Sequence, residues 1–180
     1  MSTNSGWPPA QVIETPRLTL EPLRIEHAQE MVSLLDDRGL HEYIGGHPAT
    51  LDELRDRYAR QVVGRPADGT QGWLKWIARR RETGAAIGTV QATVQDDAGE
   101  TVAAITWVVA ASYQRQGFAV EAARGMVKWL GQHGVDVLVA YIHPEHAASI
   151  GVARRLGLEA TDVISDGETR WTIPASCTSR

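Results

Sequence analysis

The residues best suited to bind a charged group form a short polar loop between two regular apolar patterns. The loop reads Gln114, Arg115, Gln116, Gly117, Phe118 and Ala119. It leads into a helical pattern, and the first N–H groups of a helix have no internal acceptor and carry the positive end of its dipole. Glycine also lets the backbone approach a ligand closely. The loop therefore predicts an anion site, with a simple turn before a helix as the alternative.

Two predicted elements hold this loop. Val102 to Val109 is apolar on both alternating faces except at Thr106, which is typical of a strand covered on both sides. After the loop, apolar residues recur at helical spacing up to Gly134, which is placed to end the helix. They are Ala119, Ala122, Ala123, Met126, Val127 and Leu130. The next strand, Val135 to Ile142, is reached through this helix, so the two strands are predicted to be parallel neighbours.

The end of that second strand carries candidates for acid–base chemistry. Alternation places Tyr141 and His143 on one face, directed toward the end where the loop lies. An unperturbed histidine has the pKa that general-base catalysis near neutrality requires, and a structural histidine is the competing interpretation. His143 and His146 have no third ligand in view, so no metal site is predicted.

The remaining patterns predict one domain over residues 14–174, a flexible lead-in over 1–13 and a tail over 175–180. A strand is expected at Arg17 to Leu23 and a helix at Glu26 to Leu35. A second helix follows Thr50, whose spacing to Glu53 matches a capping box. Three antiparallel strands then start at Trp73, with turns at 83–84 and 96–100, and two more over 158–163 and 168–173 close the sheet.

The loop resembles the Gln/Arg-x-x-Gly-x-Gly/Ala signature of the GNAT superfamily of acyl-CoA-dependent N-acetyltransferases. The helix from His146 to Leu156 resembles the family's Asn-x-x-Ser helix, with His146 in place of Asn and Leu158 in place of a following Phe. The resemblance covers roughly Glu14 to Pro174 and is nearest to the Rim type, which acetylates the N-termini of ribosomal proteins. It implies an α/β (α+β) GNAT fold, in which about four helices flank a mixed, mostly antiparallel sheet of about seven strands with a splayed parallel pair at its centre.

The same resemblance implies how acetyl-CoA would bind. The amides of Gln114 to Ala119 would hold its pyrophosphate, and a bulge in the first parallel strand would leave the backbone of Trp107, Val108 and Val109 free to pair with pantetheine. The N–H of Val108 or Val109 would face the oxyanion. His146 and Arg155 are further cofactor candidates. For the acceptor, the resemblance points to His41, Glu42 and Tyr43, in a loop that could equally be a simple connection.

The implied reaction moves an acetyl group from acetyl-CoA to a primary amine by direct attack in a ternary complex. Where many relatives carry a proton-donating Tyr this chain has Ala153, so Ser149 is the remaining hydroxyl, unless it only bonds its own backbone. Deprotonation at pH 7 costs about 4.6 kcal/mol for an amine of pKa about 10.4 but about 1 kcal/mol for an α-amine near 7.8. Because no carboxylate interrupts 101–109, an α-amine is favoured. The alternative is a catalytically weak or inactive acyl-CoA-binding or regulatory module.

Composition narrows the partners. A net charge of −4 argues against nucleic acid, and the basic run Arg79 to Arg81 is interpreted as a solvated hairpin end. The one cysteine, Cys177, fits a reducing compartment. Without a signal pattern or an apolar run of membrane-spanning length, a cytoplasmic protein without a membrane partner is expected. The acceptor would be a protein N-terminus or a small-molecule amine, and the chain a monomer or homodimer.

Overall fold

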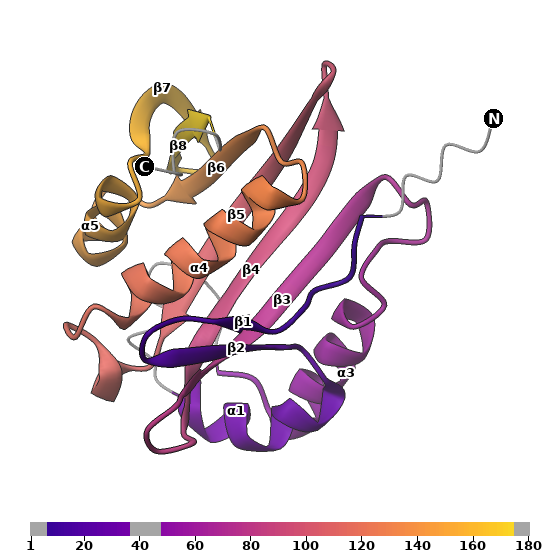
Figure 1. Ribbon diagram of the computed structural model, residues 1–180, viewed down its shortest axis with the longest axis vertical. Helices are drawn as coiled ribbons and strands as arrows, with labels where there is room; N and C mark the ends of the chain where they lie inside the picture. Colours follow the sequence, from indigo (N-terminus) through magenta and orange to yellow (C-terminus); the bar gives the residue numbers. More distant parts are fainter. Residues whose placement is uncertain (1–6, 37–47, 175–180) are drawn as a thin grey trace.

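The computed structural model describes residues 7–36 and 48–174 of the chain. Its centre is an eight-stranded sheet in the order β1-β2-β3-β4-β5-β6-β8-β7 (Figure 1). The strands are β1 Ile13–Glu14, β2 Leu18–Pro22, β3 Gln71–Arg80, β4 Ala86–Asp97, β5 Glu100–Val109, β6 Val137–Ile142, β7 Glu159–Ser165 and β8 Glu168–Pro174. Every neighbouring pair is antiparallel except β5 and β6, which confirms the predicted mixed sheet.

Four α-helices in the described residues flank this sheet. They are α1 Ala28–Leu34, α3 Leu51–Gln61, α4 Phe118–Gln132 and α5 Ala147–Arg155. Alternation along β3 divides the core in two: Trp76 packs with the buried face of α4, whereas Ile77 packs with α1 and α3. The capping box of α3 is present, since Glu53 N donates to Thr50 Oγ1 at 3.2 Å and Thr50 N donates to Glu53 Oε2 at 3.0 Å.

The ordered fold begins before the predicted boundary at residue 14. Residues Ile13 and Glu14 pair with β2, and Trp7 packs against the core. The Trp7 ring lies where a side chain on Gly72 would project, so only glycine fits there. Trp76 Nε1 donates to the Gln11 carbonyl at 2.7 Å. The lead-in predicted as flexible is thus held from Trp7 onward, because it covers one end of β3.

The parallel pair separates soon after it forms. β5 and β6 are in register only from Val102 with Val137 to Ala104 with Val139, and their later residues run apart (Figure 1). The expected bulge is not found in the β4–β5 register, which is continuous from Gly88–Val109 to Asp97–Glu100. The irregularity is in the backbone itself: the Val108 carbonyl stands where a Gly88 side chain would project. Glycine at 88 therefore accommodates a turned peptide without a shift in register.

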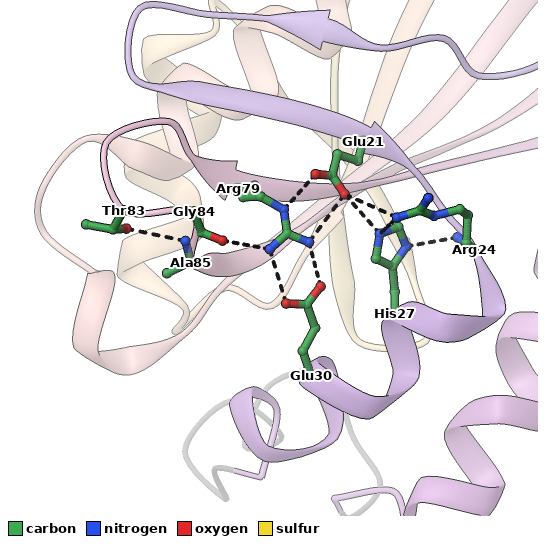
Figure 2. A network of polar contacts seen from close by, with 8 residues as sticks. All are labelled: Glu21, Arg24, His27, Glu30, Arg79, Thr83, Gly84 and Ala85. Atoms are coloured by element: carbon green, nitrogen blue, oxygen red, sulfur yellow. Dashed lines mark hydrogen bonds and ion pairs between the residues drawn. The ribbon is translucent and has the colours of Figure 1, made fainter.

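A polar network joins the edge of the sheet to α1. Figure 2 shows Arg79 between two carboxylates, with Nε 2.6 Å from Glu21 Oε1 and Nη2 2.6 Å from Glu30 Oε1. The buried His27 ring lies 3.0 Å from Glu21 Oε2 through Nε2. Its Nδ1 accepts from Arg24 N, so the proton of the neutral ring is on Nε2. The interpretation of Arg79 to Arg81 as a solvated hairpin end is therefore wrong for Arg79, whose side chain is 21% exposed.

Replacing Arg79 by Met should lower the free energy of unfolding by about 1–3 kcal/mol, since it leaves Glu21 and Glu30 without their shared cation. The hydrogen bond from Arg79 is the main reason that the pKa of Glu21 lies below its ordinary 4.5, against an opposing effect of burial. The stabilisation is present above that value and is lost as pH falls through the lowered pKa. Urea unfolding at pH 7 and in acid measures both effects.

The matched control is Arg55→Met, which removes an exposed arginine near Asp52 and should change stability by at most about 0.5 kcal/mol. A difference between wild type and Arg79→Met that is equally large at low pH would contradict the assignment of this energy to the Glu21 carboxylate.

Candidate active site

The predicted anion loop is exposed and has the backbone shape that the site requires. Gly117 caps α4 with φ of 81° and Arg115 has φ of 62°, so both lie in the left-handed region. The first bond within α4 runs from Glu121 N to the Gly117 carbonyl at 3.0 Å. The N–H groups before Glu121 have no acceptor inside the helix. Gln114, Arg115, Gln116 and Gly117 are all exposed, and turned N–H groups of this kind form an anion-binding concavity.

One ion pair fixes the loop against the edge of the sheet. Arg17 Nε lies 2.8 Å from Glu121 Oε1, and Arg17 Nη1 donates to the Gln116 carbonyl at 2.9 Å. Thr15 Oγ1 donates to Glu121 Oε2 at 2.6 Å. Burial raises the pKa of Glu121, but the hydrogen bonds from Thr15 and Arg17 outweigh it, so the pKa lies below its ordinary value. Glu121 is thus a neutralised carboxylate at the positive end of α4.

The Phe118 side chain is not exposed in the loop, although the residue lies within the predicted signature. Its side chain is 2% exposed and belongs to the core, so only its backbone can face a ligand. The Arg17 guanidinium carbon lies 4.2 Å from the centre of the Phe118 ring, and that of Arg80 lies 5.3 Å from it. Arg80 is therefore not part of a solvated hairpin end, because it lies over the ring at the start of α4. Ala119 is partly buried against the same core.

The hydrogen-bond pattern shows which backbone groups of β5 face the opening beside β6. Ala110 N donates to the Ile87 carbonyl, which marks Gly88 and Val109 as a pair without mutual hydrogen bonds. By alternation, the N–H and C=O groups of Val109, Trp107 and Ile105 point away from β4. The bridge of Ala104 with Val139 takes the Ile105 N–H, and beyond it the described register gives the remaining groups no partner on β6. They are the groups that an extended ligand could reach.

This pattern corrects two of the predicted contacts. The Val108 N–H points toward β4, where Val108 pairs with Thr89, so of the two oxyanion candidates only the Val109 N–H faces the opening. The Val109 carbonyl already accepts from Gln114 Nε2 at 2.9 Å. The Gln114 side chain therefore ties the loop to the strand end. Ile105, which sequence reasoning did not single out, presents its carbonyl to the opening, since the parallel bridge of Ala104 with Val139 uses its N–H.

Tyr141 near the end of β6 and His143 just after it lie at the same end of the parallel strands as the loop. Tyr141 is 41% exposed and pairs with Arg170 on β8. His143 follows β6 and its Nδ1 accepts from Glu145 N at 3.2 Å. That bond occupies the one lone pair of the neutral ring, since the proton is then on Nε2. Its predicted role as general base stays a prediction.

The first turn of α5 brings Ser149 beside His146, with Oγ 3.4 Å from Nε2. This pair sits directly after the end of β6. The position where relatives carry Tyr is occupied by Ala153, which is fully buried. Arg155 lies at the far end of α5, where its carbonyl accepts from Arg124 Nη2 at 3.0 Å and its side chain is exposed. Its predicted cofactor contact stays a prediction, as do the predicted cofactor contact of His146 and the predicted catalytic role of Ser149.

Some predicted features lie outside what the structure describes. The acceptor candidates His41, Glu42 and Tyr43 fall in 37–47. Within the described ranges, no group of three or more His, Cys, Asp or Glu side chains could hold a metal ion. No helix among the described elements combines the length and apolar character needed to cross a membrane.

Sequence reasoning missed Arg17, Arg80 and Glu121. The available signal was Glu121 itself, because a carboxylate one turn after Gly117 repels a bound anion unless a cation neutralises it. Its partner Arg17 lies 104 positions away along the chain. Only the pairing of β1 and β2 beside α4 brings the two together, and local sequence patterns do not contain that contact.

Comparison with known proteins identifies the family. Residues 17–159 match the family described as the acetyltransferase (GNAT) domain, which is most of the chain. The chain belongs to the GNAT acetyltransferase family. The uncharacterized protein YkkB of Bacillus subtilis (strain 168) is 28% identical over 106 residues, which are 58% of this chain and 59% of YkkB. The match thus spans less than two thirds of that relative.

Solved structures agree with the GNAT fold. RimL, the ribosomal L7/L12 alpha-N-protein acetyltransferase solved with coenzyme A, has a TM-score of 0.76 at 13% identity, covering 91% of this chain and 98% of RimL. AAC(6')-Ib, solved with paromomycin and acetyl-CoA, has a TM-score of 0.74 at 20% identity, covering 91% of this chain and 98% of that enzyme. At these identities the likeness shows the fold, and substrates have to be argued from the site.

Replacing Arg17 by Met should weaken coenzyme A binding about 10- to 100-fold, because a hydrogen bond to a charged group is worth about 1.5–3 kcal/mol. The change releases the Gln116 carbonyl and leaves the Glu121 carboxylate unneutralised beside the anion loop. Titration calorimetry with coenzyme A measures the loss. Adding Glu121→Gln to Arg17→Met should recover part of the affinity, since it removes the repulsion between the unneutralised Glu121 carboxylate and the phosphates of coenzyme A. Equal affinity of wild type and Arg17→Met would exclude this bracing role.

Proposed function

We propose that the chain transfers an acetyl group from acetyl-CoA to a primary amine by direct attack in a ternary complex. The observation that carries this proposal is the early end of the β5–β6 pairing at Ala104 and Val139, with the exposed loop 114–117 at the same end of the two strands. A phosphate-binding loop beside an unpaired strand edge suits a ligand with a diphosphate and an amide-containing arm. Coenzyme A has both.

Different residues bind different parts of coenzyme A. The N–H groups from Gly117 to Val120 face the diphosphate, and Arg17 and Arg80 lie beside them, paired with Glu121 and Glu82. The backbone of Ile105 and Trp107 provides donors and acceptors for the pantetheine amides, as an added strand would require. The thioester then lies toward Val109, at the end of the opening. Solved GNAT structures with coenzyme A or acetyl-CoA, including RimL and AAC(6')-Ib, support this assignment.

The chemistry needs a neutral amine, an oxyanion donor and a proton for the thiolate. The amine nitrogen attacks the thioester carbon, and the Val109 N–H stabilises the negative oxygen of the tetrahedral intermediate, an effect typically worth about 3 kcal/mol. The C–S bond then breaks. Ser149 donates a proton to the leaving sulfur, and His146, 3.4 Å from it, can resupply that proton. The amine loses its own proton to water, because His143 Nδ1 is engaged with Glu145.

The acceptor is a protein N-terminus or a small-molecule amine. An α-amine requires the least help from a base, since its deprotonation at pH 7 costs only about 1 kcal/mol. RimL is named for an alpha-N-protein acceptor and AAC(6')-Ib was solved with an aminoglycoside, so relatives of this fold support both classes.

Gly117→Glu should abolish acetyl-CoA binding. A side chain at this position enters the anion loop at 3.3 Å from Arg17 Nη2, where a carboxylate would take the place of the phosphate. The left-handed φ of 81° adds strain. The control is Gly99→Glu, which adds the same charge at a φ of 87° in the open turn after β4 and should bind normally. Calorimetry that finds unchanged acetyl-CoA affinity in Gly117→Glu counts decisively against the site.

Ser149→Ala should lower kcat about 100-fold with little change in KM, as expected for loss of a general acid. Thiol release with a panel of α-amines and other primary amines provides the assay. An unchanged kcat would show that the Ser149 hydroxyl only hydrogen-bonds to the backbone of α5. Acetyl-CoA binding without thiol release from any amine would instead favour the non-catalytic, acyl-CoA-responsive alternative.

A further inference from the structure

An open hollow lies between α3 and the strands β3 and β4, on the face of the sheet opposite α4. It has a volume of about 370 Å³ and adjoins a second hollow of about 380 Å³ that reaches toward Trp7. Lys75, Trp73 and Gln61 line both of them. The first hollow also reaches Gln91 on β4.

All charged residues that line the hollows, among those the structure describes, are cations. Arg57, Arg60 and Lys75 line the first and Arg65 the second, with no Asp or Glu in either set. This is a local excess of positive charge in a chain of 18 basic and 22 acidic residues. Neighbouring cations without a carboxylate between them repel one another, and an anion in the hollow removes that repulsion.

Lys75 is the centre of this cluster. Its ammonium lies 5.2 Å from the centre of the Tyr58 ring and donates to Gln61 Oε1 at 3.3 Å. An ammonium group has three donors, so further donors remain for a ligand. Burial, and to a smaller extent the charge of Arg57, lowers the pKa of Lys75 to about 8. The Tyr58 ring and Gln61 offset part of the cost of this cation, and no carboxylate among the described lining residues offsets the rest.

The hollow is within reach of the transfer site. Gln91 pairs with Thr106 of β5, directly before Trp107, and Lys75 pairs with Gln91. Adjacent strands are about 4.8 Å apart, so Lys75 and Gln91 stand about 5–10 Å from β5, on the face toward which Thr106 points. Val109 lies three residues, or about 10 Å, further along β5. A molecule whose amine reaches the thioester there could extend back along the sheet and place a second group among these cations.

We propose that this hollow, through Arg57, Arg60 and Lys75, binds a carboxylate or phosphate group of the amine acceptor. This inference rests on the proposed acetyl transfer, and it narrows the acceptor to primary amines that also carry an anionic group. Both anions suit guanidinium and ammonium donors.

The test compares acceptors in matched pairs by thiol release: γ-aminobutyrate against its amide, aminopropylphosphonate against propylamine, and a peptide with acidic second residue against its amidated analogue. Wild type should favour the anionic member at least about tenfold in kcat/KM, the equivalent of one charged hydrogen bond. The first pair reports a carboxylate and the second a phosphate-like group. Equal rates within every pair would overturn the inference while leaving acetyl transfer intact.

Lys75→Gln and Arg60→Gln should each remove most of this preference without changing the affinity for acetyl-CoA. Arg55→Gln is the control, since it removes a cation from the same helix that lies near Asp52 and does not line the hollow. Arg60 is exposed, so its variant keeps the test valid if Lys75→Gln does not fold. A preference that survives in both variants but falls in Arg55→Gln would refute the assignment.

If no amine releases thiol, the proposed acetyl transfer is wrong, and calorimetry then tests anion binding in the hollow by itself. Wild type saturated with coenzyme A should bind aminopropylphosphonate at least about tenfold more tightly than Arg60→Gln does, because one charged hydrogen bond is lost. Equal binding by the two proteins would overturn the anion site.

Discussion

The structure depends on β5 having a different partner at each end. Its first residues are hydrogen-bonded on both edges, whereas beyond the Ile105 N–H only the β4 edge is paired. Backbone N–H and C=O groups need partners wherever water is excluded. A strand that starts inside a sheet and ends beside an opening therefore creates a binding edge without any special side chain. Gln114 shortens that edge by taking the Val109 carbonyl, so the opening ends in a single N–H.

Two consecutive arginines on β3 make contacts on opposite faces of the sheet. Because side chains alternate along a strand, Arg79 points to α1 and joins Glu21 and Glu30, while Arg80 points to α4 and lies over Phe118. The same sheet edge thus positions the helix that flanks the acceptor face and the loop that faces the diphosphate. A movement of this edge would disturb both sites together.

Local patterns were enough to predict the elements but not the contacts between them. The periodicity after Ala119, the capping box at Thr50 and the helical crossover give the helices, the sheet and its parallel pair correctly. The pairing of Arg17 with Glu121 and the exclusion of the Val108 N–H depend on the register between strands and on residues far apart in the chain. Periodicity predicts the face of an element on which a side chain lies, but it does not predict which residue contacts that side chain.

Net charge was the weakest of the sequence arguments, for a physical reason. Screening limits interactions between exposed charges to about 8 Å in physiological salt, so a ligand responds to the few groups around it and hardly to a total of −4. Around the loop those groups are the N–H groups of α4, with Arg17 paired to Glu121 and Arg80 paired to Glu82, and around the hollow they are Arg57, Arg60 and Lys75. The helix N–H groups and the three cations both favour an anion. The net charge of the whole protein would attract a cationic acceptor, whereas the cations of the hollow would bind an acceptor that carries an anion. The cations of the hollow act over the shorter distance, so their effect on the acceptor is the stronger one.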